Sequence, residues 1–86
     1  MPEISRFLGI VIAMYYKEHG VPHFHAKYGE FRGALSIEDL KLIEGSLPKR
    51  VRSLVLEWAF EHREELAENW DLAREGKPLN PIPPLE

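Results

Sequence analysis

Apolar residues follow two different periods along the chain. Residues 9–16 are mostly β-branched or aromatic with few polar interruptions, which predicts a strand buried on both faces for much of its length. After Pro48 and up to Glu75 there is neither proline nor glycine, and apolar side chains recur at the helical spacing until Gly76 and Pro78 end the run. Strands followed by a helix predict an α+β protein.

The stretch 23–37 has the pattern of a β-hairpin. Residues 23–28 and 31–37 flank Gly29-Glu30, and glycine at the first central position of a two-residue loop favours a type II′ turn. This turn sets the pairing of the two strands, because the loop length fixes the register. The expected opposed pairs are 27/32, 26/33, 25/34, 24/35 and 23/36.

This register sorts the hairpin residues by polarity. One predicted face carries Phe24, Ala26, Tyr28, Phe31, Gly33 and Leu35. The other carries His23, His25, Lys27, Arg32, Ala34 and Ser36. An apolar face opposite a polar, basic face is typical of a half-buried antiparallel pair. We therefore expect the first set to belong to the core.

A short strand over 40–43 and one long helix complete the predicted elements. The helix should cover the sheet with Val51, Leu54, Val55, Trp58, Ala59, His62, Leu66, Asn69, Trp70 and Ala73. The predicted fold is a small antiparallel sheet of three to four strands packed on one long C-terminal helix. Residues 1–76 form the predicted single domain, and 77–86 a proline-rich, extended tail that is either docked or mobile.

Composition narrows the class of protein. Eighty-six residues provide one small core, and the absence of cysteine excludes a disulfide framework and any thiolate site. No apolar run approaches a membrane span, and the first residues lack the features of a secretory signal, so we expect a cytoplasmic protein. The net charge of −3 is uneven: residues 1–52 carry eight Lys/Arg against six Asp/Glu, and residues 53–86 three against eight. A local basic face can therefore still bind an anion.

The polar face of the hairpin is the strongest candidate for chemistry. His23 and His25 project the same way, Lys27 continues the row, and Arg32 lies opposite Lys27. Like charges in opposition repel, and a bound phosphate would reverse that cost. Histidines can exchange protons near neutral pH. His23 and His25 are thus candidate acid/base residues for metal-free RNA cleavage, with Lys27 and Arg32 as substrate contacts. The competing interpretation is a solvated or binding-only sheet face.

Two other histidine arrangements deserve comparison with this one. A His-x-His pair on a strand can chelate one metal ion, with His19, Glu18, Glu30 or His62 as completing ligands, but the spacing supports only the pair. We predict no metal site and no cofactor on this basis, although the sequence leaves open whether His23 and His25 bind a metal ion. His62 lies between apolar residues of the helix, where a hydrogen-bonded core-edge role is more usual than catalysis.

The helix also carries a candidate partner surface. Six carboxylates form a stripe that repels itself and so favours a basic partner or a second copy of the chain, although a solvated outer face is the ordinary alternative: Glu57, Glu61, Glu64, Glu68, Asp71 and Glu75. Leu56 and Phe60 lie behind the main apolar side. They are either a contact patch for a partner or are covered by the tail.

Several segments resemble a known family. They are Phe7-Leu8-Gly9-Ile10-Val11-Ile12, Pro22-His23-Phe24-His25-Ala26, Tyr28-Gly29, Glu44-Gly45-Ser46-Leu47-Pro48, Leu56-Glu57-Trp58-Ala59, and Glu64-Glu65-Leu66 through Asn69-Trp70. The chain resembles domain-of-unknown-function family 4160 over nearly its whole length. Members are small bacterial proteins, frequently encoded beside another short protein, and some are labelled toxins of type II toxin–antitoxin pairs. The resemblance carries over no catalytic residues.

Two functions are expected from residues and resemblance together. The first is a toxin-like or regulatory protein that acts on RNA through the His/Lys/Arg face and is held in check by a small antitoxin-like protein. The second is a non-enzymatic module whose basic face binds nucleic acid or a protein partner. The sequence leaves open whether the protein is an enzyme and whether it forms a homo-oligomer.

Overall fold

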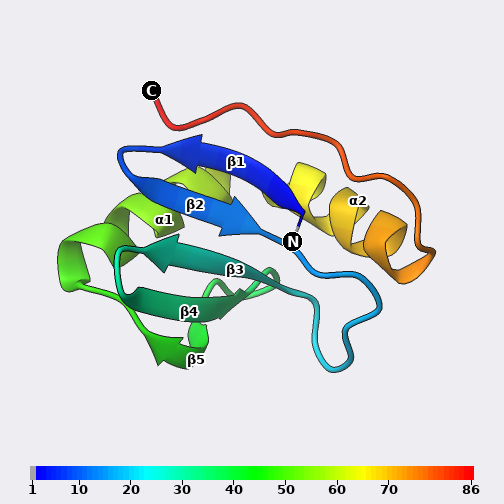
Figure 1. Ribbon diagram of the computed structural model, residues 1–86, viewed down its shortest axis with the longest axis horizontal. Coiled ribbons are helices and arrows are strands. Elements are labelled where there is room, and N and C mark those ends of the chain that lie inside the picture. The colour runs from blue at the N-terminus through cyan, green and yellow to red at the C-terminus, as the bar shows by residue number, and fades with distance from the viewer. Residues whose placement is uncertain (1) are drawn as a thin grey trace.

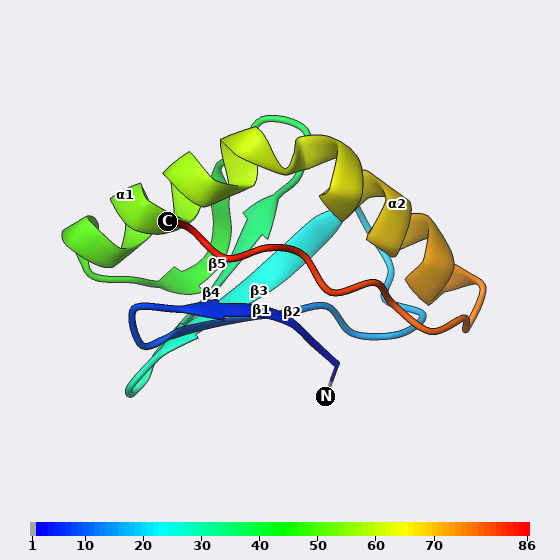
Figure 2. The same cartoon turned by 90° about the horizontal axis from the view of Figure 1, so that it is seen from above.

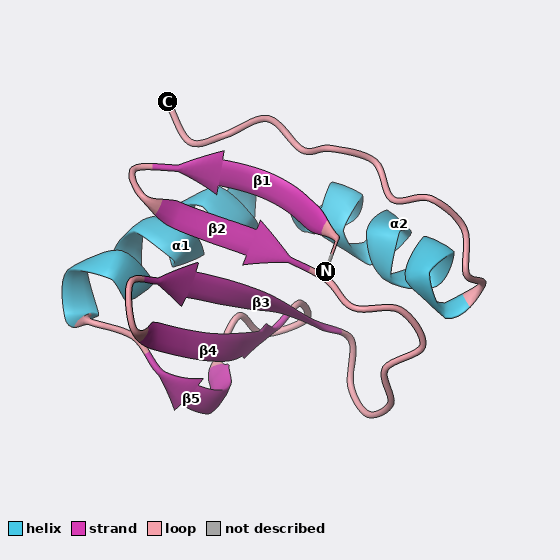
Figure 3. Cartoon of the chain, in the orientation of Figure 1, coloured by secondary structure: helices cyan, strands magenta, loops and turns pink. Residues whose placement is uncertain are grey.

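The computed structural model describes residues 2–86, which fold into one five-stranded antiparallel sheet and two helices (Figure 1). The strands lie in the sheet in their sequence order. The elements are β1 (Glu3–Phe7), β2 (Ile10–Ala13), β3 (His23–Tyr28), β4 (Phe31–Ser36), β5 (Leu42–Ser46), α1 (Lys49–Glu61) and α2 (Arg63–Arg74). Secondary structure is therefore segregated as predicted, with strands first and helices last (Figure 3).

The predicted number of strands was too low, because the chain begins with an additional strand. β1 pairs with β2 through a tight turn at Leu8 and Gly9, whose φ angles are 49° and 79°. The pairing is irregular between Glu3 and Ser5, so β1 lacks the clean alternation that identifies a strand from sequence. The predicted strand over 9–16 shortens to four residues, and the predicted strand over 40–43 is found at Leu42–Ser46.

The central hairpin has the predicted register. All five expected pairs between β3 and β4 are present, and Tyr28 and Phe31 flank the turn. Gly29 has a φ of 57° and Glu30 has no positive φ, as a type II′ turn requires. The prediction that Tyr28 and Phe31 belong to the core was wrong, because these side chains remain 38% and 44% exposed. They lie at the far end of the hairpin.

The predicted long helix is broken at His62. Its φ and ψ of −116° and 27° depart from helical values, although its N–H still donates to the carbonyl oxygens of Trp58 and Ala59. No proline or glycine marks this break, so composition does not reveal it. The bend lets α1 and α2 follow the same face of the twisted sheet, as seen from above in Figure 2.

The core lies between that face and the helices. Trp58 of α1 is fully buried, and its ring lies 5.5 Å from Phe7 and 6.1 Å from Phe24. Most residues of the predicted helix face are buried: Val51, Val55, Trp58, Ala59, Leu66, Asn69, Trp70 and Ala73. Leu54 and His62 are half-buried, because they lie at the margins of this face.

The C-terminal tail crosses the molecule beside β1 (Figures 1 and 2). The Ile82 N–H donates to the Ile4 carbonyl at 2.8 Å, and the indole N–H of Trp58 donates to Pro83 O at 2.8 Å. The buried Asn69 amide donates to Asn80 O and accepts from Asn80 N, both at 2.9 Å. The tail is thus docked by main-chain polar groups and by the buried Ile82 side chain. Within residues 2–86, neither helix is long and apolar enough to cross a membrane.

Candidate functional site

The sheet face opposite the helices carries the polar row predicted for the hairpin. His25 and Lys27 of β3 lie on this face, and Lys27 pairs directly with Arg32 of β4. Both cationic side chains are exposed. Within residues 2–86, both helices lie on the other side of the sheet (Figure 2), so this face is open at Lys27 and Arg32. At its other end α2 reaches the His23 ring through Trp70.

Three side chains meet where β3 begins. The Nε2 atom of His25 lies 2.7 Å from Glu18 Oε1, and the Nε2 atom of His23 lies 3.3 Å from the same oxygen. The two imidazole rings are 5.2 Å apart. We call Glu18, His23 and His25 the histidine–carboxylate cluster. Both histidine Nε2 atoms are therefore directed at one carboxylate oxygen.

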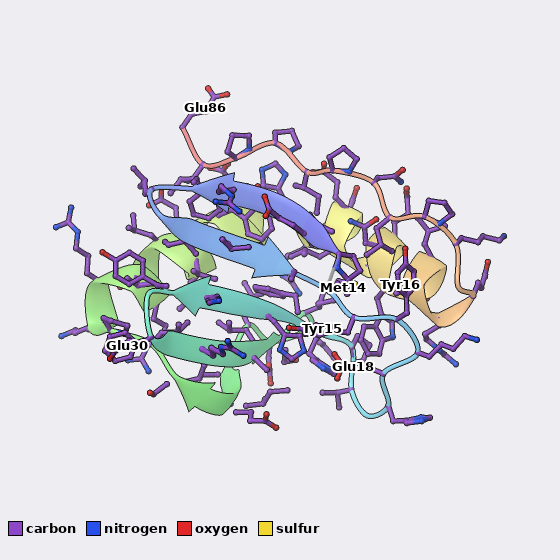
Figure 4. The ribbon with its side chains drawn as sticks, in the orientation of Figure 1. Met14, Tyr15, Tyr16, Glu18, Glu30 and Glu86 are labelled. Atoms are coloured by element: carbon purple, nitrogen blue, oxygen red, sulfur yellow. The ribbon has the colours of Figure 1, made fainter. Side chains whose placement is uncertain are left out.

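The connection between β2 and β3 brings Glu18 to the histidines. It turns at Lys17, whose φ is 57°, and the Lys17 N–H donates to Ala73 O of α2 at 3.3 Å. Figure 4 shows Tyr15 and Glu18 together at the end of the sheet where β3 starts. The position of Glu18 thus depends on contacts between this connection and α2.

Aromatic rings enclose the cluster on two sides. Tyr15 meets the His25 ring edge-on at 4.5 Å, and Trp70 of α2 lies 5.1 Å from the His23 ring. The His23 side chain is 9% exposed, whereas the His25 side chain is 26% exposed. A molecule on the open face can therefore reach His25, while His23 lies behind it.

The tautomer of His23 follows from its other contact. Its Nδ1 atom lies 2.7 Å from the carbonyl oxygen of Val21, which can only accept a hydrogen bond. The Nδ1 atom must therefore carry a proton, and a neutral His23 presents the Nε2 lone pair toward Glu18. The His25–Glu18 contact, in contrast, has the length of an ordinary charge-assisted hydrogen bond.

A shallow hollow adjoins the cluster on the open face. Its walls include the His25 ring, Tyr15, and the cationic pair Lys27 and Arg32; the full lining is Val11, Ala13, Tyr15, His25, Ala26, Lys27, Arg32 and Gly33. The structure therefore brings three of the four predicted chemical residues, His25, Lys27 and Arg32, around one hollow.

The remaining candidate residues lie elsewhere. His62 contacts Glu65 at 2.5 Å and the Trp58 ring, and in the described part of the chain no ion pair or ring contact joins it to the cluster. Phe60 is 68% exposed and lines a second groove with Glu61 and Glu64. Leu56 is half-buried against the core. Glu57 and Glu68 are exposed farther along the helices, and Glu68 accepts a hydrogen bond from the Asn80 amide.

Glu18 is a site residue that the sequence pattern does not single out. The sequence offers it only as one of four groups that could complete a metal site, since no periodicity relates a loop carboxylate to a strand seven residues away. The sequence predicts Tyr15 in a strand and Trp70 in the core, and neither prediction links these residues to the histidines. Glu18, Tyr15 and Trp70 belong to the site because they lie close to the histidines in space, which the sequence pattern does not show.

Comparison with known proteins identifies the family alone. The family described as a domain of unknown function, DUF4160, matches residues 9–71, which include His23, His25 and most of the two helices. No curated protein and no solved structure matches the chain. The matched segment covers well over half of the sequence, so the chain belongs to the DUF4160 family.

Proposed function

We propose that the protein is the toxin-like or regulatory member of a two-protein pair and acts on RNA at the open sheet face. The observation that supports this most directly is the opposition of Lys27 and Arg32 beside a hollow that His25 also lines. Two cations in direct opposition destabilise a bare sheet, and a phosphate group between them removes that repulsion. Arginine can also bind phosphate through two parallel hydrogen bonds.

The two histidines take different roles in this proposal. His25 meets the substrate, because it borders the hollow and is partly exposed. Glu18 holds the His25 ring in place through their 2.7 Å contact. His23 supports the cluster from its buried position against Trp70. RNA phosphates bound at Lys27 and Arg32 would thus bring the adjoining backbone against His25.

Binding and cleavage of single-stranded RNA test this proposal together. The double variant K27A/R32A should bind RNA more weakly, and its slope of log affinity against log salt should fall by about 0.7 for each RNA phosphate that the two cations neutralise. The control K49A/R52A removes two exposed cations from α1 and should retain the parental slope. Equal slopes for the two double variants would show that this face does not bind RNA.

The His25→Ala variant separates catalysis from binding. It should bind RNA with nearly parental affinity, lose cleavage, and no longer inhibit growth when expressed alone. If the parent protein binds RNA but never cuts it, the function is instead that of the non-enzymatic binding module.

The partner surface is proposed at the second groove. Phe60 provides an apolar contact there, and the exposed carboxylates of Glu61 and Glu64 favour a basic, amphipathic segment of a small antitoxin-like protein. Glu57 and Glu68 extend the negative charge, while Leu56 contributes less because it already packs against the core.

Co-expression with the product of the adjacent gene tests this surface. Phe60→Ser should weaken copurification by at least tenfold without changing thermal stability, since the side chain is mostly exposed. Tyr16→Ser, at a side chain that is 43% exposed elsewhere, is the control. Equal copurification of both variants would place the partner on another surface.

A further inference from the structure

When His23 is neutral, two hydrogen-bond acceptors face each other in the histidine–carboxylate cluster. His23 donates from Nδ1 to Val21 O, so its neutral ring presents a lone pair to the Glu18 carboxylate at 3.3 Å. Two acceptors at this distance repel one another unless a proton or a cation lies between them. His25 also directs its Nε2 atom to the same oxygen. A cation at this point would satisfy both rings and the carboxylate together.

The separations are close to those of a metal centre. Three ligand atoms at about 2.1 Å from a tetrahedral ion lie about 3.4 Å from one another. The His23–Glu18 separation of 3.3 Å already meets this condition, and all three ligand atoms lie within 4.8 Å of one another. The 2.7 Å contact of His25 must lengthen by about 0.7 Å, which a small rotation of a partly exposed ring allows.

The surroundings are those that orient metal ligands. The Nδ1–H of His23 is held by a backbone carbonyl, as is usual for histidines bound to metals. Trp70 and Tyr15 restrict the two rings. Glu18 and His25 are 30% and 26% exposed, so an ion can enter from solvent and keep water at its remaining positions.

We propose that Glu18, His23 and His25 bind one first-row divalent cation, with Zn²⁺ as the representative ion. Two imidazoles and one carboxylate favour Zn²⁺ and its neighbours in the first transition row over Mg²⁺ and Ca²⁺, which prefer oxygen ligands. An ion here would add positive charge beside Lys27 and Arg32. This inference goes beyond the proposed function: the ion replaces the direct His25–Glu18 contact invoked there. It does not depend on that function, because its test needs only the protein and the ion.

Titration of chelator-treated, dialysed protein with Zn²⁺ tests the site. The parent should bind one ion per chain, and His25→Ala and Glu18→Gln should each weaken binding by about 100-fold or more, since even second-shell losses cost 10–100-fold. His62→Ala is the control, because His62 and Glu65 form a separate two-group pair that should not contribute. Mg²⁺ should not compete.

Ring nitrogen NMR of the parent avoids any variant that fails to fold. Zn²⁺ should shift the Nε2 resonances of His23 and His25 and leave those of His19 and His62 unchanged. Equal affinity of the parent and His25→Ala, or no shift at His23 and His25, would overturn the proposal and identify the cluster as an ion pair of structural origin. RNA binding at Lys27 and Arg32 can fail without affecting either measurement.

Discussion

Replacing Ile82 with alanine tests whether the C-terminal tail is part of the folded unit. The Ile82 side chain is 4% exposed, and its backbone N–H donates to Ile4 at 2.8 Å. The substitution keeps that hydrogen bond and removes only buried apolar atoms. It therefore measures how strongly side-chain packing holds the tail against the sheet and helices.

The expected loss of folding stability follows from the burial of the Ile82 side chain. Truncating a buried isoleucine to alanine costs about 2–5 kcal/mol, and a site near the molecular surface belongs at the lower end, so we expect about 2 kcal/mol. A domain of 86 residues has a total stability of roughly 4–13 kcal/mol. The variant should therefore remain folded, with a melting temperature about 8–16 °C lower.

Urea unfolding monitored by tryptophan fluorescence provides the measurement, because Trp58 and Trp70 are both buried. The matched control is Ile43→Ala, which removes the same atoms from a side chain that is 48% exposed and should cost less than about 1 kcal/mol. Equal midpoints for the two variants would refute the docked position of the tail. If the free energy of unfolding falls less steeply with urea concentration for Ile82→Ala alone, the tail has detached in that variant.

The remaining predictions concern the turns and pH. Gly45→Ala should destabilise by more than about 3 kcal/mol, because φ is 76° and the added Cβ would lie 2.2 Å from Arg32 O. Gly29→Ala, also at positive φ but with no atom nearby, should cost only about 1 kcal/mol in the same urea assay, so equal losses would exclude the steric explanation. The hydrogen bond from Ser36 lowers the pKa of Asp39 below its ordinary 3.8. The ionised Asp39 carboxylate therefore stabilises the fold above pH 3.8, and this stabilisation is lost as the pH falls through the lowered pKa. The difference in unfolding free energy between the parent and Asp39→Ala should disappear in that pH range. A gap unchanged at low pH would contradict this assignment.

The central hairpin and its polarity were predictable because they depend on local rules. Gly29 selects the turn, and the alternation of residues along β3 and β4 then admits only one register. The opposition of Lys27 and Arg32 follows from that register, as does the shared side of His23 and His25. The burial of the helix face followed equally from its period.

Tertiary packing alone decided the other features. Glu18 meets the histidines because the connection after β2 docks on α2, and Tyr28 and Phe31 stay exposed at the far end of the hairpin. The bend at His62 and the docking of Ile82 likewise have no local signal. Sequence patterns report which way a side chain points within its own element. The assembly of elements determines what that side chain meets, and here it converts a His-x-His strand into a three-residue cluster with a loop carboxylate.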